Sequence, residues 1–564
     1  MSDVPSPVPL LIALGQFLRG RYRSLVLVAA VLATSGFVIT RGIHNGEFNF
    51  NTDETIHAST GLYFADFLRD LPLRHPLQYT FRYYAQYPAL GVLHWPPIFH
   101  MFEGLAFLLF GSTVEVARAT ILMFALLGIY FLFRLVEYLE NRLAAIIASL
   151  LFAFFPLTLL FEKVVMLEIP ALSLTIGAIY FWIRYLKEER KSDIYRFAFF
   201  DCAALLTKQT VAFLIPVCVL AAVLTKRIAQ IFLQKTTWYV AAACGVVLSP
   251  YYLALSHFHG AALAKSVEAT HPVTLLQRTT FYWRALPGQI TWVVLALSVL
   301  GIVTYCARKE WEKLALAMAW IFGCYVTLTP IGFQAPRFII YWLPAWAWLA
   351  AVPFSVSLGH RVPRTLQTAA AIVLLSAQAL WALSYQRPSV TGYGSAARGL
   401  VSMAKSGYVL FDGPLPGNFI FFVRASDPSR RIGVLRKALY VTMLIKDEGS
   451  EELVHGFDGI RNVLAADGVR YIVVAENTPT SFPVQQTLRD LLHKDHQFRL
   501  RGVFPVRGCD PIRPDTFLAI YENLEARGAA TPYLHVKMLT THHDLDVPFG
   551  TLGPPPYSFD VSRR

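Results

Sequence analysis

Residues 95–111 read WPPIFHMFEGLAFLLFG, and the topology of the whole chain depends on whether this segment crosses a membrane. The segment is apolar enough to resemble a span, but its apolar core is short, it begins with Pro96 and Pro97, and it contains Glu103. A membrane-spanning helix needs about 20 predominantly apolar residues. We therefore predict a helix that lies in the membrane–water interface on the outer side and does not cross the membrane.

The composition of the 564-residue chain is that of a membrane protein: 55% of residues are hydrophobic, 15% are charged and the mean hydropathy is +0.46. A formal net charge of +13 would also suit a protein that binds nucleic acid on a basic face. Many Lys and Arg residues instead lie in short clusters between apolar runs. This pattern is typical of cytoplasmic loops, so we expect membrane lipids and no nucleic acid as partners.

Apolar runs divide the first two thirds of the chain into about 11 expected spans. The first follows Arg19, Arg21 and Arg23, and it is expected to be retained because no small-residue cleavage site comes after it. The runs lie near residues 24–40, 115–136, 143–160, 169–184, 194–207, 210–225, 237–256, 288–307, 314–331, 338–355 and 366–384.

The interfacial placement of residues 95–111 sets the side of every later loop. If this segment crossed, the basic clusters that follow would face outward, against the positive-inside rule. The clusters are Arg184/Lys187/Arg190/Lys191, Lys226/Arg227, Arg308/Lys309/Lys313 and Arg361/Arg364. We therefore expect the N-terminus inside and the C-terminus outside.

The pattern changes at about residue 385 to short β-rich runs that alternate with amphipathic helices, which predicts an extracytoplasmic α/β domain over 385–564. The expected strands are 406–413, 418–425, 469–476 and 516–523, and the expected helices are 451–468 and 483–495. The predicted fold is mainly α: a polytopic transmembrane helical bundle over 1–384, with interfacial helices in a first outer loop (41–114), followed by this α/β domain.

The first outer loop contains FNFNTDETIHAS, in which Asp53 and Glu54 precede a helical pattern that begins near Thr55. Asp53 could simply cap that helix, with Thr52 or Asn51 as competing caps. A carboxylate fixed at a helix start could equally act as a general base, while its acidic neighbour tunes it or binds a metal.

The second outer turn, FEKVVMLEIPALS, places Glu162 at the end of one span and Glu168 directly before Ile169 and Pro170, where the next span begins. Glu168 could serve only as a favourable charge at a helix N-terminus. A carboxylate beside a span is nevertheless costly without a partner or a water-filled cavity. Two acidic sites on one face suggest a shared polar cavity.

Two cations fall on the same outer face. Lys208 interrupts the apolar hairpin LLTKQTVAFLIP, and Arg337 precedes a span in PRFIIYWLPAWAWLAA. Both could bind a phosphate, Lys208 as a compact charge and Arg337 as a bidentate fork. The alternatives are a lysine that snorkels to the interface and an arginine that anchors a helix end above a belt of tryptophans.

Histidines on the outer side are weaker candidates. His57 and His94 are considered as further site members, although most histidines there are expected to be loop or interface residues. The sequence contains no HExxH ligand set, so it does not identify a metal.

The order of these motifs resembles the glycosyltransferase C superfold, specifically the branch of protein O-mannosyltransferases and lipid A aminoarabinose transferases. The resemblance covers residues 1 to about 355. The motifs are TDETIHA, HWPPIFHMFEGLAFLLFG followed by VEVARATILMFALLGIYFLFRLVE, MLEIPALS, LLTKQTVAFLIP and PRFIIYWLPAWAWLAA.

This resemblance implies a multi-pass enzyme of the plasma (inner) membrane that transfers a sugar from a polyprenyl-phosphate donor to a hydroxyl on the extracytoplasmic face, with inversion. The acceptor would be a protein, a lipid or a glycan. The resemblance makes Asp53 the base, with Glu54 beside it, and associates Lys208 and Arg337 with the donor phosphate. Glu168 matches an acidic position that is Asp in many relatives, and it would orient the acceptor or share a divalent cation.

One segment departs from the pattern of this family. Some relatives have an acid or a lysine before the proline, where this chain has the segment from His94 to Pro97. The role of that segment is therefore open.

Two other classes of function compete with the enzyme. A transporter or a lipid-linked-sugar flippase would also carry intramembrane charges. Transporters tend to show repeated halves and charges near the bilayer midplane, whereas the charges here gather at one face. A membrane-anchored binding protein, with its function in the C-terminal domain, is the third possibility.

Overall fold

The protein is described here by a computed structural model. It describes residues 8–50, 52–92, 94–267, 274–331, 334–355, 363–441, 451–508, 516–536 and 544–556. Arg361, in the last expected basic cluster, and Asn51, a competing helix cap, lie outside the described residues.

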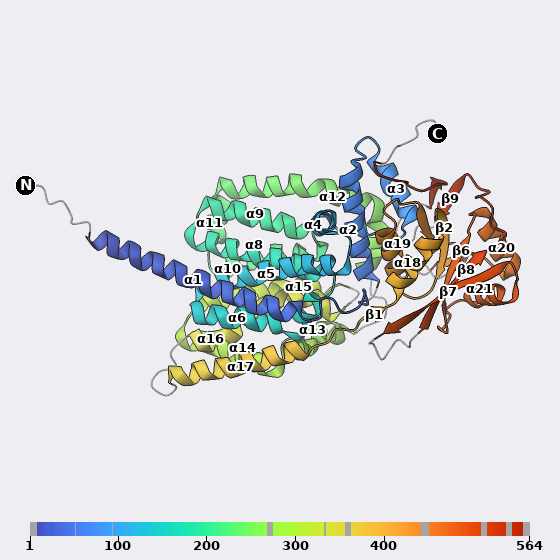
Figure 1. Ribbon diagram of the computed structural model, residues 1–564. Coiled ribbons are helices and arrows are strands. Elements are labelled where there is room, and N and C mark those ends of the chain that lie inside the picture. Colours follow the sequence, from blue (N-terminus) through green and yellow to red (C-terminus); the bar gives the residue numbers. More distant parts are fainter. Residues whose placement is uncertain are drawn as a thin grey trace, which may run out of the picture.

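A bundle of helices forms the larger part of the molecule, and an α/β part covers one end of it (Figure 1). Within the described residues, six helices are long and apolar enough to cross a membrane, or up to eight if each of two bent helix pairs forms one span. The six lie in α1 (Val8–Thr40), α5 (Val114–Leu139), α8 (Glu168–Glu188), α12 (Lys235–Val267), η2 with α16 (Pro336–Trp342, Leu343–Ser355) and α17 (Arg364–Ser384).

The bent pairs and several short helices occupy the other expected spans. Helices α6 (Arg142–Phe154) and α7 (Pro156–Glu162) meet at 67°, and α13 (Leu275–Ile290) and α14 (Trp292–Arg308) meet at 110°. The expected pair of spans around residue 200 corresponds to α9 (Lys191–Leu205) and α10 (Leu214–Leu224), with 15 and 11 residues. Both are shorter than the roughly 20 residues of a straight span. Helix α15 (Trp311–Leu328) carries Glu312 and Lys313 at its start.

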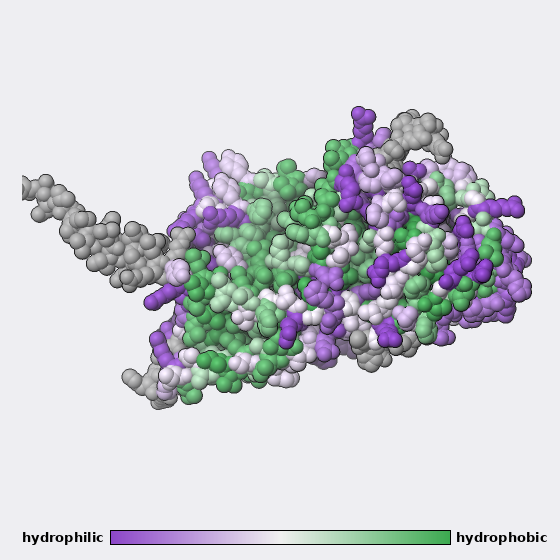
Figure 2. Space-filling view, in the orientation of Figure 1, coloured by the Kyte–Doolittle hydropathy of each residue, from purple (hydrophilic) through white to green (hydrophobic). Residues whose placement is uncertain are grey.

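The surface of the bundle is a broad hydrophobic band with hydrophilic patches at the end away from the α/β part (Figure 2). Large apolar side chains of α12 are open to the surroundings, with Trp238, Val246 and Leu253 exposed at 55%, 72% and 68%. Such a continuous apolar surface suits a lipid environment. The protein is therefore a multi-pass membrane protein.

The first outer loop holds three helices at the end of the bundle next to the α/β part: α2 (Asp53–Asp70), α3 (Pro76–Gln86) and α4 (Ile98–Phe110). Helix α4 packs on α2 so closely that a Cβ on Gly104 would lie 2.7 Å from the Cβ of Phe64. Its opposite face is apolar and open, with Leu109 and Phe110 exposed at 65% and 75%. With 13 residues, α4 is about 20 Å long, too short for a hydrocarbon core of about 30 Å.

Tryptophans fill the interior of the bundle. The alternative of a tryptophan belt at the membrane interface is not supported, because Trp342 and Trp348 are fully buried and Trp346 is 5% exposed. The indole of Trp342 donates to Oε1 of Gln289 at 3.0 Å. These side chains therefore pack the core behind Arg337 and do not anchor it to an interface.

The α/β part is built on a six-stranded sheet in the order β1-β7-β8-β6-β2-β3. Strands β2 (Gly407–Asp412), β3 (Ile432–Leu435) and β6 (Tyr471–Glu476) run parallel, and β7 (Phe498–Gly508) and β8 (Thr516–Asn523) pair antiparallel. The remaining elements are β1 (Val390–Thr391), α18 (Tyr393–Met403), α19 (Pro416–Ser426), β4 (Tyr440–Val441), β5 (Glu451–Glu452), α20 (Gly456–Ala466), α21 (Pro483–Lys494), β9 (Tyr533–Val536) and β10 (Leu545–Pro548).

One expected strand is wrong. Residues 418–425 lie in helix α19, which begins at Pro416. A short apolar run is ambiguous between a buried strand and a buried helix, and proline in the first helical turn favours the helix. The expected strands at 406–413, 469–476 and 516–523 and the helix at 483–495 are confirmed within two residues. The helix expected over 451–468 is confirmed only from Gly456, and Glu451–Glu452 form strand β5 instead.

Buried ion pairs fasten the α/β part to the first outer loop. Arg424 of α19 pairs with Asp66 of α2, with its Nε 2.7 Å from Oδ2. Arg430, in the loop before β3, pairs with Asp70, and both side chains are fully buried. Since an unpaired buried charge is strongly destabilising, these pairs fix α2 against the α/β part.

Candidate active site

Four of the predicted residues form one continuous chain of contacts. Nη1 and Nη2 of Arg337 both donate to Oδ2 of Asp53, at 3.1 Å. Nε of Arg337 lies 3.8 Å from Oε1 of Glu168, and the same oxygen accepts a hydrogen bond from Nζ of Lys208 at 2.7 Å. Acidic and basic side chains thus alternate along the chain of contacts, and the four formal charges sum to zero.

Each member of this cluster stands at the start of a helix at the same end of the bundle. Asp53 and Glu168 are the first residues of α2 and α8, Lys208 directly precedes η1 (Gln209–Phe213), and Arg337 is in the first turn of η2. The positive end of a helix favours a carboxylate, which suits the two acids. Asp53 is not the helix cap, since Thr52 takes that position.

The cluster has an open half and a closed half. The side chains of Asp53 and Arg337 are 20% and 19% exposed, whereas those of Glu168 and Lys208 are 1% and 5% exposed. Burial lowers the pKa of Lys208, and the nearby carboxylate of Glu168 opposes that shift. Glu168 therefore favours the charged form of the buried ammonium, and a ligand would reach the cluster from the side of Asp53 and Arg337.

Glu54 points away from this cluster. Its Oε2 accepts the backbone N–H groups of Asn49 and Phe50 at 3.0 and 2.9 Å, and its Oε1 accepts that of Val165 at 3.1 Å. Glu54 is fully buried in this role. The geometry makes it a brace between the first and second outer loops, and so a positioning residue for Asp53.

His57 lies one helical turn after Asp53 and forms a relay with His100. Its Nδ1 is 3.0 Å from Nε2 of His100, whose Nδ1 is 3.2 Å from the carbonyl oxygen of Pro96. A carbonyl oxygen only accepts, so His100 carries its proton on Nδ1 and accepts the Nδ1–H of His57. This assignment leaves Nε2 of His57 as a hydrogen-bond acceptor.

Both rings of the relay are held neutral. Burial lowers the pKa of His57 well below its usual value, and His100, Lys208 and Arg337 lower it further. Burial also lowers the pKa of His100, to about 3. His57 is therefore close enough to the two cations to respond to them, and it adds no positive charge to the site.

His94 contributes through its backbone. Its carbonyl oxygen accepts a hydrogen bond from Nε2 of Gln209 at 2.6 Å, and the N–H of Ile98 donates to the carbonyl of Leu206 at 2.9 Å. The segment that departs from the family pattern thus lies against the turn that carries Lys208. His100 is the residue that sequence reasoning missed, because 43 positions separate it from His57 and no spacing rule connects them.

Glu162 is not brought into the cluster. It is buried at the end of α7, and neither carboxylate oxygen has a hydrogen-bond partner among the residues that the structure describes. Among all the residues that the structure describes, no group of three or more His, Cys, Asp or Glu residues is placed to hold a metal ion.

Comparison with known proteins identifies solved structures that share this fold. Residues 94–253 match the family model described as dolichyl-phosphate-mannose-protein mannosyltransferase, a stretch that includes Glu168 and Lys208. No curated protein matches the chain. Among solved structures, ArnT from Cupriavidus metallidurans bound to undecaprenyl phosphate is similar with a TM-score of 0.51 and 13% identity, over 90% of this chain and 99% of that one.

Two further structures share the fold. The arabinofuranosyltransferase AftD from mycobacteria has a TM-score of 0.54 and 16% identity, over 92% of this chain and 41% of that one. The Archaeoglobus fulgidus oligosaccharyltransferase in complex with Zn and sulfate has a TM-score of 0.52 and 13% identity, over 79% and 67%. The resemblance to the glycosyltransferase C superfold is confirmed, and this chain has that fold.

Proposed function

We propose that the protein is an integral membrane glycosyltransferase that moves a sugar from a polyprenyl-phosphate donor to an acceptor hydroxyl on the extracytoplasmic face. The contact chain from Asp53 through Arg337 and Glu168 to Lys208 carries this proposal, because it combines a carboxylate base with two phosphate-binding cations. The family match and the fold, shared with a relative solved with undecaprenyl phosphate, support it.

The donor phosphate would bind Arg337 and Lys208. In the structure Nη1 and Nη2 of Arg337 donate to a single oxygen of Asp53, whereas a phosphate would offer the same fork two oxygens. Exchange of partners would release Asp53 from its cation. A carboxylate that loses a neighbouring positive charge becomes a better proton acceptor.

The reaction would proceed as a single displacement with inversion. The acceptor oxygen attacks the anomeric carbon, the carbon–oxygen bond to the phosphate breaks, and the acceptor proton passes to Asp53. The bonding electrons leave with the phosphate, whose added charge Arg337 and Lys208 stabilise. We assign Glu168 to keep Lys208 charged and in place, because its Oε1 already accepts that ammonium at 2.7 Å.

We further propose the plasma (inner) membrane as its location, with about 11 crossings, the N-terminus inside and the α/β part outside. Arg134, Arg142 and Arg184 line one cavity together with Ser24, near the start of the first span. That span ends at Thr40, close to the first outer loop, so these cations lie at its other end. Positive residues at the end away from the site support this orientation.

The test uses the purified full chain in lipid nanodiscs with radiolabelled polyprenyl-phosphate sugars. The expected result is cleavage of one such donor in the presence of an envelope extract, with the label appearing in an acceptor. Asp53→Asn should lower the rate by about 10²- to 10⁴-fold, the typical contribution of a general base. Glu115→Gln, at a helix start with a half-exposed side chain, is the matched control.

The competing function has a different signature in the same preparation. A flippase would move the intact donor between leaflets of a liposome without cleaving its glycosyl bond. Transport without cleavage would overturn the proposed enzyme.

A further inference from the structure

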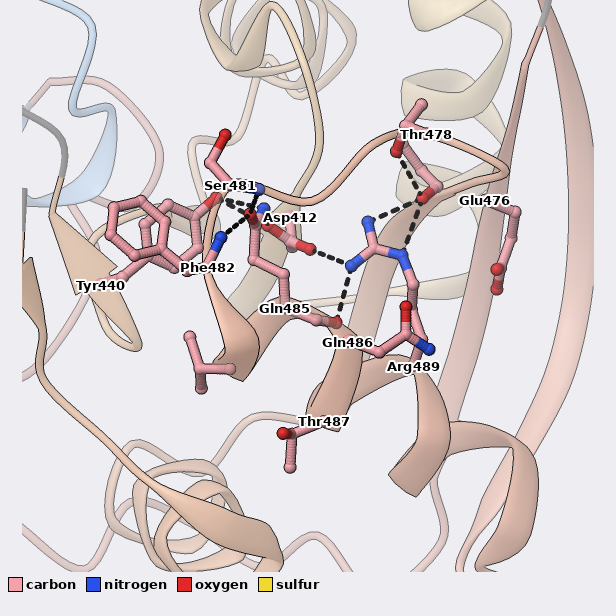
Figure 3. Close-up of polar contacts among 12 residues, drawn as sticks. Asp412, Tyr440, Glu476, Thr478, Ser481, Phe482, Gln485, Gln486, Thr487 and Arg489 are labelled. Carbon is pink, nitrogen blue, oxygen red and sulfur yellow. Dashed lines mark hydrogen bonds and ion pairs between the residues drawn. The ribbon is translucent and has the colours of Figure 1, made fainter.

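The α/β part contains a buried arginine whose three nitrogens all have partners within the protein (Figure 3). Nε and Nη2 of Arg489 donate to the carbonyl oxygen of Ala475, and Nη1 donates to Oδ2 of Asp412 at 2.8 Å. The other carboxylate oxygen of Asp412 accepts hydrogen bonds from Tyr440 and Gln485, each at 2.7 Å. The protein itself satisfies this network, so the network gives no indication of a ligand.

A larger polar cavity lies at the opposite end of the molecule, where hydrophilic patches border the hydrophobic band of the bundle (Figure 2). Side chains of α1, α5, α6 and α8 line it, and its volume is about 640 Å³. Cavities that bind small molecules have volumes of about 300 to 1,000 Å³. The cavity is therefore large enough for a phospholipid head group.

Arginines outnumber acids among the described residues that line this cavity. Arg134 of α5, Arg142 of α6 and Arg184 of α8 lie in the wall with two acids, Glu137 and Glu188. These side chains carry an excess of one positive charge, which is the charge that one phosphodiester would neutralise.

Two of the arginines share one carboxylate. Oε2 of Glu137 accepts a hydrogen bond from Nη1 of Arg134 at 2.6 Å, and its Oε1 accepts one from Nε of Arg142 at 3.3 Å. A single carboxylate cannot neutralise two guanidinium groups. The side chains of Arg134 and Arg142 are 37% and 43% exposed, so a ligand in the cavity can reach both.

The acids beside Arg184 are shared in the same way. Nη2 of Arg184 lies 3.6 Å from Glu188 and 3.2 Å from Asp193, but Glu188 also pairs with Arg190 and Asp193 also pairs with Arg196. In contrast to Arg489, Arg184 has a buried Nε without a hydrogen-bond partner among the residues that the structure describes. A buried N–H without a partner is costly, and an anion bound beside it would remove that cost.

The wall formed by α1 is suited to a lipid chain. Ser24, Leu25 and Val28 of this helix line the cavity, and Leu25 is 58% exposed. Ser24 is the third residue of the first candidate span, which begins at Tyr22. The cavity thus lies at the edge of the hydrophobic band, at the depth where a phospholipid has its phosphate.

From this arrangement we infer that the cavity binds the phosphate of an anionic phospholipid, whose acyl chains lie along α1. Guanidinium groups suit this task because they hold phosphate oxygens in pairs. Basic pockets between membrane helices on the cytoplasmic side bind acidic lipid head groups in other proteins. The lipid would join α1 to the three helices that share the cavity. The inference goes beyond the proposed function, and the proposed orientation makes the lipid one of the inner leaflet.

The experiment measures the fluorescence anisotropy of phosphatidylglycerol labelled on one acyl chain, titrated with the full chain in a nonionic detergent. The competitors are unlabelled phosphatidylglycerol, phosphatidylcholine with the same chains, and inorganic phosphate. We expect unlabelled phosphatidylglycerol to displace the probe, and the other two competitors to displace little of it at the same concentration. Equal displacement by phosphatidylcholine would exclude recognition of the negative charge, and equal displacement by inorganic phosphate would identify a site for the free ion and not for a lipid.

Arg134→Gln should weaken binding of the labelled lipid by about tenfold, as loss of a charge-assisted hydrogen bond would. Arg134→Lys keeps the charge and should retain part of the binding, which separates loss of charge from misfolding. Arg308→Gln is the matched control, because Arg308 has a 47% exposed side chain and pairs with Glu310 at 2.9 Å. It should leave binding within about twofold of the wild type. Equal binding by the wild type and Arg134→Gln would overturn the inference.

The lipid site and the proposed donor site can be tested separately. Arg337→Gln removes a cation from the proposed donor site and should leave binding of labelled phosphatidylglycerol unchanged. Weaker binding in that variant would assign the probe to the donor site and refute the inference. Lipid binding needs no turnover, so it can be observed even if no donor is cleaved. Conversely, donor cleavage by a chain that does not bind phosphatidylglycerol would support the glycosyltransferase and remove only the lipid site.

Discussion

Arg337 places both of its terminal nitrogens on a single oxygen of Asp53, at 3.1 Å each. The proposed base and one of the proposed phosphate ligands are therefore each other's partner before any donor binds. This pairing satisfies both charges in the structure, and under the proposed function donor binding would free the base.

The variant Arg337→Lys tests whether the donor phosphate replaces Asp53 as the partner of Arg337. A lysine keeps the positive charge but loses the fork that holds two oxygens at once. We expect donor affinity to fall by about tenfold, the equivalent of roughly 1.4 kcal/mol. The measurement is binding of a labelled polyprenyl phosphate, with Arg41→Lys as the control at the outer end of α1. Unchanged affinity in Arg337→Lys would show that the fork does not hold the phosphate.

Lys208 and Glu168 should behave as a coupled pair. Lys208→Met leaves the carboxylate of Glu168 almost fully buried without its ammonium, which should cost about 3 to 5 kcal/mol of unfolding free energy. The double variant Lys208→Met with Glu168→Gln should regain much of that stability, since no bare charge remains. It should not regain donor cleavage, because the phosphate ligand is still missing. Thermal unfolding and activity are measured on the same samples, and equal stability of the single and double variants would contradict this coupling.

The His57–His100 relay should make stability depend on pH. The folded-state pKa of both rings lies below the unfolded value, and that of His100 is about 3. The unfolded chain therefore binds protons that the folded chain does not, so stability falls as the pH drops below about 6.5. Each ring contributes up to about 1.4 kcal/mol per pH unit in that window.

The double variant His57→Gln with His100→Gln should flatten this dependence between pH 6.5 and 5. His44→Gln removes a histidine whose side chain is 79% exposed and serves as the control. Chemical unfolding in detergent at several pH values gives the slope. A slope that persists in the double variant would assign the dependence to other groups.

Gly417→Ala should disturb the contact between α19 and α2. The added Cβ would lie 1.9 Å from Oγ1 of Thr55, so one of the helices must move. Overpacking of this kind costs about 1 to 3 kcal/mol, and the shift should also reduce donor cleavage through Asp53. Gly528→Ala, where no atom lies within 4 Å, should change neither property. Wild-type stability and activity in Gly417→Ala would show that the contact is not needed.

Some features of this protein follow from local rules and others do not. That Asp53, Glu168, Lys208 and Arg337 meet at one end of the bundle was predictable, because each stands at or beside a helix start, and both position and helix start can be inferred from charge and hydropathy. Their roles in catalysis stay a prediction. The 13 residues of α4 agree with the expectation that residues 95–111 do not cross the membrane, and the interfacial placement itself stays a prediction. The bends at Phe155 and Thr291 and the short helices near residue 200 were not predictable, because they depend on neighbouring helices.

The remaining errors share a physical cause. An apolar run gives no information about which neighbour buries it, so α19 was expected to be a strand, and a belt of tryptophans at the interface stayed open as an alternative. The link between His57 and His100 depends on the tertiary approach of α2 and α4. Long-range contacts of this kind leave no trace in local spacing.

The ion pairs of Asp66 with Arg424 and of Asp70 with Arg430 also constrain the order of assembly. The partners are 358 and 360 residues apart, so both acids are made long before the cations that neutralise them. Helix α2, which begins with Asp53, cannot reach its final environment until the last third of the chain has been synthesised and delivered to the same side of the membrane. A chain that ends before Arg424 lacks both cations, so Asp66 and Asp70 would be left without these partners. We therefore expect such a chain to hold the first turn of α2, and with it Asp53, less firmly.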